Sequence, residues 1–218
     1  MGERSYVGRP FQGRRRGPER PALLLLLVCL VSACSGRPPE DTRDYAQRIA
    51  ADRTAKDALF QGRNDPIPDA KKADLLPLAY FPIDPAYDVP ASLQLVDDKT
   101  IIDMPTSTGS PRKMRKAGTL TFSLKGQPLS ITAFYDLTGT PDHLSVMFSD
   151  MTSGTESYAA GRYLDLDRNP TGIYELDFNR AYHPYCYYNA SYECPYPPPE
   201  NRLKVPIRAG ERTRQSHS

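Results

Sequence analysis

The sequence predicts a mainly-β fold, an antiparallel sandwich or a small barrel, with one N-terminal amphipathic helix and long proline-rich loops. From about residue 91, short segments alternate polar and apolar residues and are rich in β-branched and aromatic side chains, which is typical of half-buried strands. Turn-forming residues separate these segments. A helical period occurs upstream, in residues 41–60. Together these patterns favour sheets built from hairpins.

The N-terminal leader has the composition of an export signal. Six arginines and two glutamates occupy residues 1–20, and the apolar run PALLLLLVCLVSA leads to Cys34. A positive region, a short apolar region and small residues before a cleavage site make up such a signal, and the run is shorter than the about 20 residues of a bilayer span. VSAC resembles a bacterial lipobox, so we expect residues 1–33 to be removed and Cys34 to be lipidated. A plain signal peptide and a buried core segment are the alternatives.

The predicted lipid on Cys34 would make a membrane the first partner of the chain. Several acyl chains on one residue give stable anchoring. Ser35 favours the outer membrane with the domain facing the periplasm, or the cell membrane where no outer membrane exists. Without the leader, 22 basic and 24 acidic residues are left, a net charge of about −2. No basic stripe is present, so we expect no nucleic-acid partner.

The first part of the exported chain combines a tether, a helix and a proline-rich segment. Residues 34–41 are predicted to form the tether, and DTRDYAQRIAADRTAKDALF predicts an amphipathic helix capped by Asp41 or Thr42. Its apolar positions are Tyr45, Ile49, Ala55 and Leu59. Six prolines in residues 61–90 prevent long regular structure there. We expect this segment to cover the core, anchored by Leu75, Leu76, Tyr80 and Phe81.

Seven strands are predicted in the remainder of a single domain at 42–212, followed by a disordered tail at 213–218. The turns LKGQP and LTGTPD are short enough for hairpins. The strand segments, in order, are SLQLV, TIIDM, TLTFSL, LSITAFYD, HLSVMFSD, GRYLDL and IYELDF.

Common catalytic motifs do not occur in the sequence. It has no GxSxG, no HExxH and no glycine-rich phosphate loop, and its histidines are His143, His183 and His217. Carboxylate chemistry would still be open to a hydrolase of an envelope ester or glycan. The candidate carboxylates are Asp150, Asp165, Asp167, Asp177 and Glu200.

Polar residues around Arg162 form the candidate ligand site. An arginine at the start of a predicted strand, between Gly161 and Tyr163, can point inward, where it needs a carboxylate or a bound anion. An ion pair within the protein, with Asp150, Glu156 or Asp177, is the structural alternative. If a ligand binds, we expect it to be small and polar or anionic. The candidate residues are Asp150, Ser153, Tyr158, Arg162, Asp177, Asn179 and His183.

Two cysteines lie in the unusual segment NRAYHPYCYYNASYECPYPPPEN. Outside the cytoplasm, we expect Cys186 and Cys194 to form a disulfide. Zinc binding with His183, or a catalytic Cys–His pair, is the alternative, but structural zinc sites usually bring two close ligand pairs. The sequence therefore predicts a stapled loop, with no metal and no cofactor.

Two long blocks carry a family resemblance. FSDMTSGTESYAAGRYLDL and YELDFNRAYHPYCYYNASYECPYPPPENRLKVPIRAGER, with LAYFPIDPAYDVPASL upstream, resemble the bacterial family catalogued as domain of unknown function 1684. The likeness extends from about residue 45 to 212. It implies family motif positions at Asp150, Thr152, Ser153, Gly154, Tyr158, Gly161, Arg162 and Tyr163. It implies a second set at Asp177, Phe178, Asn179, Ala181, Tyr182, Pro184, Cys186, Cys194, Pro195, Glu200 and Asn201.

The family likeness implies no activity, so the functional expectation depends on the residues. We expect a membrane-anchored periplasmic lipoprotein that acts as a binding or envelope-maintenance module. A carboxylate hydrolase of the envelope is the second interpretation, and whether the chain is an enzyme stays open at this point. A purely structural module, in which the polar block only stabilises the fold, is the third.

Overall fold

The computed structural model describes residues 43–63, 65–138 and 143–214. The leader, Cys34, the tether, the last four residues of the turn LTGTPD (139–142) and residues 215–218 lie outside the described residues. Within the described tail, Thr213 donates its main-chain N–H to Glu156 O (2.9 Å), and Arg214 donates to Pro77 O (2.6 Å). None of the helices in the described ranges combines the length and apolar character needed to cross a membrane.

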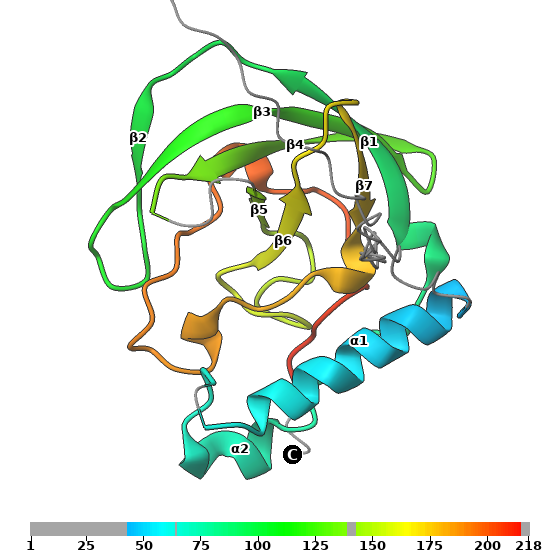
Figure 1. The fold of residues 1–218 in the computed structure, drawn as a ribbon, viewed down its shortest axis with the longest axis vertical. Helices are drawn as coiled ribbons and strands as arrows, with labels where there is room; N and C mark the ends of the chain where they lie inside the picture. Colours follow the sequence, from blue (N-terminus) through cyan, green and yellow to red (C-terminus); the bar gives the residue numbers. More distant parts are fainter. Residues whose placement is uncertain (1–42, 64, 139–142, 215–218) are drawn as a thin grey trace, which may run out of the picture. The chain divides into compact units, whose positions relative to one another are not determined.

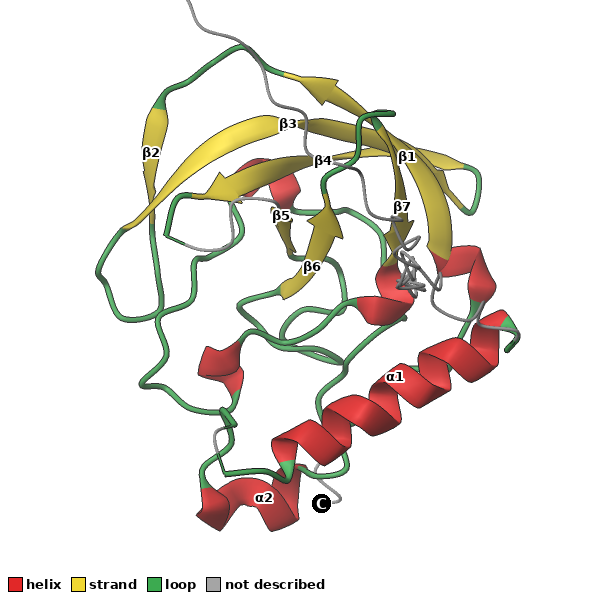
Figure 2. Cartoon of the chain, in the orientation of Figure 1, coloured by secondary structure: helices red, strands yellow, loops and turns green. Residues whose placement is uncertain are grey.

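Seven strands form one antiparallel sheet, shown in Figures 1 and 2. Each of the seven predicted strand segments lies within or overlaps an observed strand. The strands are β1 (Asp88–Leu95), β2 (Ile101–Met104), β3 (Arg112–Leu124), β4 (Gln127–Asp136), β5 (His143–Phe148), β6 (Arg162–Asp167) and β7 (Ile173–Asp177).

The sheet curves into a nearly closed barrel. Its strand order is β6-β5-β4-β3-β1-β7, with β2 paired to β3 alone. The two end strands, β6 and β7, approach each other without pairing (Figure 1). The mainly-β prediction is therefore confirmed, in its barrel-like form.

Strand β3 is longer than the sequence pattern indicates. The predicted strand begins at Thr119, whereas β3 begins at Arg112 and includes the charged stretch RKMRK. That stretch pairs with β2, from Ile101 opposite Arg115 to Met104 opposite Arg112. Its charged side chains obscure the alternation, because long basic side chains can cover a sheet while their charges stay in water. The predicted LKGQP hairpin is confirmed: it joins β3 to β4.

Two helices precede the sheet. Helix α1 spans Tyr45–Phe60, and Asp44 caps it, accepting from Gln47 N at 2.8 Å within a capping box. The expected cap at Asp41 or Thr42 was wrong because the Asp44–Gln47 pair satisfies the first turn. Helix α2, Asp69–Leu75, lies inside the segment expected to be irregular.

The main core fills the barrel, and a smaller cluster lies beneath α1. The barrel core includes Leu120, Ile131, Leu144, Val146, Phe148, Leu164, Leu176 and Phe178, all with 3 % or less of their surface exposed. In the second cluster, Phe60 packs with Ile67, Leu76, Leu78 and Tyr188. Leu59, expected on the apolar face of α1, is 66 % exposed.

Several short 3-10 turns follow β7 and complete the chain. Two of them, η2 (Phe178–Arg180) and η3 (Tyr185–Tyr187), flank the segment that carries Tyr182 and His183. A third, η4 (Pro199–Asn201), places Asn201 between β4 and β5. These turns and α1 position the polar residues described next.

Candidate functional site

Arg162, at the start of β6, forms a buried ion pair. Its Nη2 lies 2.8 Å from Asp150 Oδ2 and 2.6 Å from Ile207 O, and both charged side chains are fully buried. Its Nη1 donates to the carbonyls of Ala209 and Glu211. Burial lowers the pKa of Arg162, and Asp150 opposes that shift. The guanidinium therefore has its counter-ion within the protein, as the structural alternative predicts.

The polar turn after β5 supports this ion pair. Asp150 Oδ1 accepts from Thr152 N (2.8 Å) and from Ile207 N (3.1 Å). Ser153 Oγ accepts from Asp150 N at 3.1 Å. With Oδ2 held by Arg162, both oxygens of Asp150 are engaged. This carboxylate is therefore poorly placed for acid or base catalysis, which needs an oxygen that can reach substrate.

Asp177 and Asn179 form a second network, which holds the start of α1. Tyr45 Oη donates to Asp177 Oδ1 at 2.8 Å, and Asn179 Nδ2 donates to Tyr45 Oη at 2.9 Å. Asn179 also donates to Asp84 O (2.9 Å) and accepts from Asp84 N (3.0 Å). Burial and the Asp177 contact raise the pKa of Tyr45. This network joins three segments that are distant in sequence.

His183 is buried and neutral. Its Nε2 accepts from Tyr158 N at 3.2 Å, and its main-chain N–H donates to Glu211 Oε2 at 2.7 Å. Burial lowers the pKa of His183 to about 3. Glu211 also accepts from Lys56 (2.6 Å) and Tyr188 (2.7 Å). One of its two imidazole nitrogens, Nε2, is thus occupied by a main-chain donor.

The predicted site residues therefore divide between distinct networks. Asp150, Ser153 and Arg162 lie together, whereas Asp177 and Asn179 lie at the start of α1. Of the other candidate carboxylates, Glu200 is exposed, and Asp165 and Asp167 lie on the outer face of β6. The structure places most of the seven candidates in the scaffold that supports the cavities, with Asp177, Asn179 and His183 reaching cavity walls.

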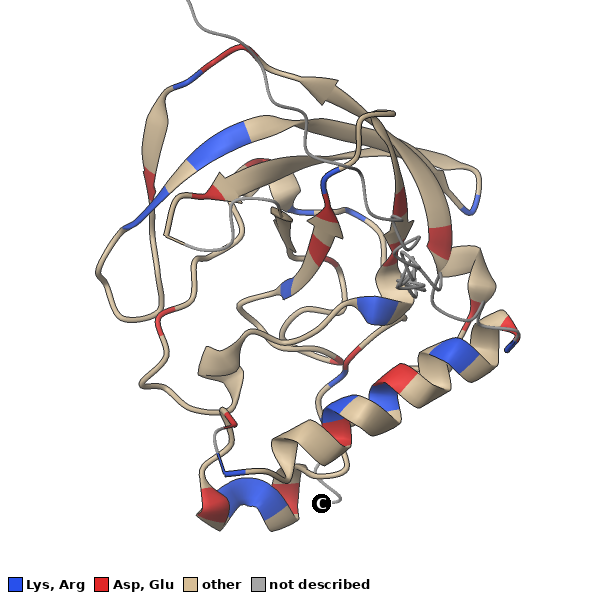
Figure 3. Cartoon of the chain, viewed as in Figure 1, with Lys and Arg blue, Asp and Glu red and all other residues tan. Residues whose placement is uncertain are grey.

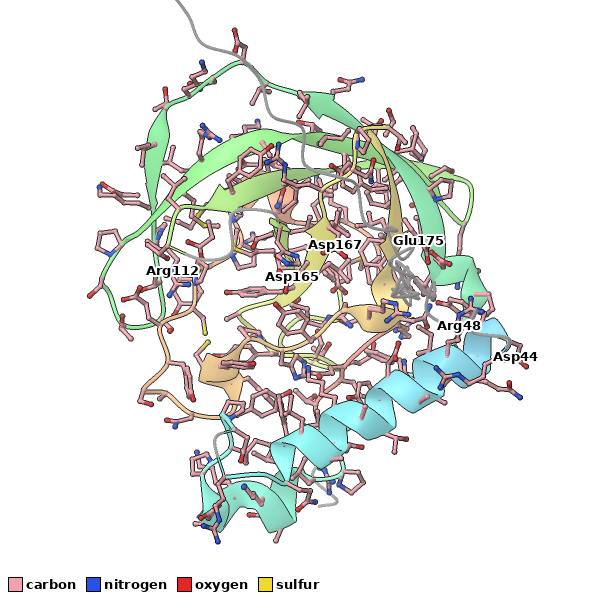
Figure 4. The ribbon with its side chains drawn as sticks, viewed as in Figure 1. Asp44, Arg48, Arg112, Asp165, Asp167 and Glu175 are labelled. Atoms are coloured by element: carbon pink, nitrogen blue, oxygen red, sulfur yellow. The ribbon has the colours of Figure 1, made fainter. Side chains whose placement is uncertain are left out.

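A large cleft, here called the tyrosine cleft, lies where α1, β3, β6 and the Tyr182–Pro195 segment meet. Its volume is about 670 Å³. Figure 4 labels two of its charged residues, Arg112 and Asp165. Its lining consists of Lys56, Leu59, Phe60, Arg112, Tyr163, Asp165, Tyr182, Pro184, Tyr185, Tyr192, Glu193, Cys194 and Pro195.

Aromatic rings dominate the walls of the tyrosine cleft. The rings of Tyr185 and Tyr192 meet edge to face, with centroids 5.3 Å apart, and those of Tyr163 and Tyr182 do so at 5.8 Å. The ring centroids of Phe60 and Tyr185 lie 6.2 Å apart. Edge-to-face pairs hold each other in place. The cleft therefore presents ordered aromatic rings to a ligand.

The charges of the tyrosine cleft are paired. Lys56 binds Glu211 and lies 4.8 Å from the centroid of the Tyr182 ring. Arg112 contacts Glu193 Oε1 at 3.4 Å. Tyr182 Oη donates to Asp165 Oδ2 at 2.6 Å. Two cationic and two acidic side chains in the lining give it no net charge.

Cys194, which lines the cleft, and its neighbour Cys186 are two buried free thiols. Cys186 N donates to Cys194 Sγ at 3.2 Å, and Cys194 N donates to Ser107 Oγ at 3.1 Å. Contact with the Cys194 thiol lowers the pKa of Cys186 to about 6, with help from Ser107 and Tyr158 and against the effect of burial. The two cysteines are neighbours, as the stapled-loop prediction requires.

Carboxylates on β1 and β7 form a group that could hold a metal ion. One oxygen from each of Asp88, Glu175 and Asp177 lies within 4.8 Å of the others. Burial, then Glu175 and Asp177, raise the pKa of Asp88 to about 6. Among the described residues, His183, Cys186 and Cys194 do not form a group of this kind.

The sequence singles out Asp165 and Cys194 for other roles, but it does not predict the tyrosine cleft as a ligand site. The segment YHPYCYYNASY has an obvious excess of tyrosine, and that excess was the available signal. Its cysteines and histidine predict a disulfide or a metal site and give no indication of the cleft. Lys56, Phe60 and Arg112 carry no local signal, because they reach the cleft from elements far away in sequence.

Comparison with known proteins identifies relatives without a known activity. A family model described as "Protein of unknown function (DUF1684)" matches residues 74–212. The solution NMR structure of the uncharacterized protein from gene locus rrnAC0354 of Haloarcula marismortui is similar, with 35% identity and a TM-score of 0.64. The match covers 80% of this chain and 97% of that one. No curated protein matches the chain.

Proposed function

This chain belongs to the family of proteins of unknown function DUF1684, and on that premise we propose that it is a binding module whose ligand occupies the tyrosine cleft. The observation that carries the proposal is the cleft itself, about 670 Å³ in volume and walled by five aromatic rings. Ligand sites are typically concave, mostly apolar and of 300–1,000 Å³, with a few polar groups that orient the ligand. The cleft meets each of these criteria.

The ligand is a small, neutral, polar compound with a flat ring face, such as a saccharide unit. Ring faces of Tyr185 and Tyr192 suit the apolar face of a ring, and the hydroxyls of tyrosines suit its polar groups. An ionic ligand is disfavoured, because Lys56 and Arg112 already have carboxylate partners. A charged ligand would have to replace one of those ion pairs.

The proposed ligand agrees with the proposed location. We infer that Cys34 carries a lipid and holds the domain at the periplasmic face of the outer membrane, the side that faces the envelope glycans. The leader composition and VSAC sequence support this. Metabolic labelling with a fatty acid should mark the wild-type chain and leave Cys34→Ser unlabelled. Labelling of both would contradict the anchor.

We also infer that Cys186 and Cys194 form a disulfide in that oxidising compartment. Cys186 N lies 3.2 Å from Cys194 Sγ, so the two cysteines are in contact. The lowered pKa of Cys186 favours its thiolate, which is the species that attacks in disulfide formation. The closed loop carries Tyr192, so the bond would also hold one wall of the cleft.

Ligand-induced stabilisation tests the binding proposal. N,N′-diacetylchitobiose is a neutral disaccharide with flat ring faces, and sorbitol provides hydroxyls without a ring. At ten times its Kd, a ligand stabilises the fold by about 1.4 kcal/mol. We expect that gain with the disaccharide for the wild type, and a loss of most of it for Tyr185→Ala and Tyr192→Ala.

Tyr196→Ala is the matched control for these two variants. Tyr196 is 40 % exposed, similar to Tyr185 (43 %) and Tyr192 (36 %), but it does not line the cleft. It should keep the full ligand response. Equal responses in all three variants would place any binding elsewhere on the surface.

A further inference from the structure

The seam between β6 and β7 is a second feature, separate from the tyrosine cleft in its chemistry. These strands are the two ends of the sheet path, and they do not pair with each other. A groove of about 540 Å³ lies along the seam. Unpaired strand edges of this kind are ready-made templates for another extended segment. We refer to this groove as the β6–β7 seam.

Main-chain hydrogen bonds show which residues face the seam. Tyr163 and Tyr182 exchange N–H···O bonds of 2.9 and 3.1 Å, so Tyr163 directs its backbone away from β5. Because this direction alternates along an antiparallel strand, Asp165 and Asp167 direct theirs the same way. The segment before Tyr182 forms η2, and within the described part of the chain it makes no main-chain hydrogen bond to Asp165 or Asp167.

The edge of β7 has the same character. Leu93 N donates to Gly172 O at 2.8 Å, which places Gly172, and by alternation Tyr174 and Leu176, on the β1 side. Glu175 therefore faces the seam. Both edges of the seam thus present main-chain groups together with acidic side chains.

The seam is strongly acidic. Four carboxylates line it, from Asp165, Asp167, Glu175 and Asp177. Arg180, the one cation among the described residues that line the seam, is already paired with Asp177 and with Asp52. Figure 3 shows the acidic bands on β6 and β7, and Figure 4 labels three of the four residues. Tyr182 Oη donates to Asp165, and Asp167 lies 3.0 Å from His143 Nδ1, but neither contact removes the excess of negative charge. A basic segment would complement that excess, whereas an acidic segment would be repelled.

We propose that the β6–β7 seam binds an extended segment of a protein partner that carries lysine or arginine at alternate positions, pairing antiparallel along the free edge of β6. The Tyr163–Tyr182 bridge is antiparallel and already uses this edge. In an antiparallel hydrogen-bonded pair, opposite residues place their side chains on the same face. Basic residues opposite Asp165 and Asp167 therefore meet carboxylates. The intervening residues point toward the apolar lining, Leu164 and Leu166.

Strand addition of this kind takes affinity from main-chain hydrogen bonds and specificity from alternate side chains. The partner motif is therefore basic and apolar in alternation, over about four residues on the free part of β6. The two requirements, charge and strand pairing, can be tested separately.

A synthetic peptide, acetyl-Lys-Val-Lys-Val-Lys-Val-Lys-amide, serves as the probe with the full-length chain. We expect the double variant Asp167→Asn/Glu175→Gln to weaken binding at least tenfold. Both residues lie outside the tyrosine cleft, so the disaccharide response should be unchanged in this variant. Asp103→Asn on β2 is the control: it removes an exposed carboxylate that pairs with Lys113 and should bind the peptide normally.

N-methylated peptides test strand pairing. Methyl groups on the main-chain amide nitrogens of the lysines remove the donors that would bond β6, so binding should be lost. Methyl groups on the main-chain amide nitrogens of the valines should leave the Kd within a factor of two or three. If both methylated forms bind equally, or if a block peptide of four lysines followed by three valines binds as well as the parent, the interaction depends on charge alone. Either result would overturn the proposal. Absence of measurable binding by the parent peptide would overturn it as well.

Discussion

Asp150 Oδ2 lies 2.8 Å from Arg162 Nη2, and water reaches neither side chain. This pair links the turn after β5 to the first residue of β6, and the Arg162 guanidinium also binds the carbonyls of the C-terminal segment. The pair is thus part of the scaffold. Removing one partner would leave the other charge buried and uncompensated.

Arg162→Ala should lower the free energy of unfolding by about 3–5 kcal/mol, the usual cost of breaking a buried ion pair. Chemical denaturation measures it. Arg208→Ala provides the comparison, because Arg208 pairs with Glu156 at 2.8 Å with 56 % of its side chain exposed. That exposed pair should contribute less than about 1 kcal/mol. Similar losses in both variants would argue against a scaffold role for the buried pair.

Substituting Asn201 should lower the free energy of unfolding about as much as substituting a buried charged residue. Its Nδ2 donates to Thr132 O (2.8 Å) and Met147 O (2.7 Å), and its Oδ1 accepts from Thr132 N (2.7 Å). The side chain thereby bridges β4 and β5, which share one registered pair, Phe134 with Ser145. Asn201→Ala would leave three buried main-chain groups without their hydrogen-bond partner, at a cost of about 1–3 kcal/mol each.

We expect Asn201→Ala to cost at least about 3 kcal/mol in a denaturation experiment. Glu200→Ala, one residue away and exposed, should change stability by less than about 0.5 kcal/mol. A loss below about 1 kcal/mol for Asn201→Ala would show that water or a local shift replaces the bridge.

Asp88 should make stability depend on pH. Its pKa is raised to about 6 in the folded chain, against about 3.9 when unfolded. Folding therefore binds a proton between these values, so the contribution of Asp88 to stability is full below about pH 4 and is lost as the pH rises through 6.

Asp88→Asn should consequently stabilise the protein above pH 6, by about 1 kcal/mol once solvent screening of this partly exposed group is allowed for. The difference in unfolding free energy between wild type and variant, followed from pH 4 to 8, isolates this group. A difference that does not change with pH would contradict the raised pKa.

The proposed disulfide should add about 2–3 kcal/mol, the usual contribution of so short a closed loop. Unreduced protein from the periplasm should yield a peptide in which Cys186 is linked to Cys194, and reduction should lower its melting temperature. The Cys186→Ser/Cys194→Ser variant should have the melting temperature of the reduced wild type, with or without reductant. Two free thiols in the isolated protein would refute the bond.

Much of the fold could be predicted because alternation of apolar residues directly reports a half-buried strand. The N-terminal half of β3 was missed because Arg112, Lys113, Arg115 and Lys116 hide that alternation. Helix α2 was missed because nearby prolines suggested irregular structure. Neither error affects the fold class, since all seven strand segments are still predicted.

The candidate site was predicted less completely. Arg162 could be identified as an inward arginine from its place in the strand pattern, and its partner Asp150 was among the residues considered. The tyrosine cleft could not be assembled, because Phe60, Arg112, Tyr163 and Tyr185 come from four separate elements. Their proximity follows from closure of the barrel and the docking of α1, which no local pattern reports.

The most direct test of the tyrosine cleft as a ligand site is an NMR titration of the chain with N,N′-diacetylchitobiose. The backbone amides of Tyr163, Tyr182, Tyr185 and Tyr192 should shift in a saturable way, with a common Kd, while those of the β6–β7 seam at Asp167 and Glu175 stay in place. Sorbitol should produce no such shifts. Absence of saturable shifts at the four tyrosines, or equal shifts with sorbitol, would contradict the assignment.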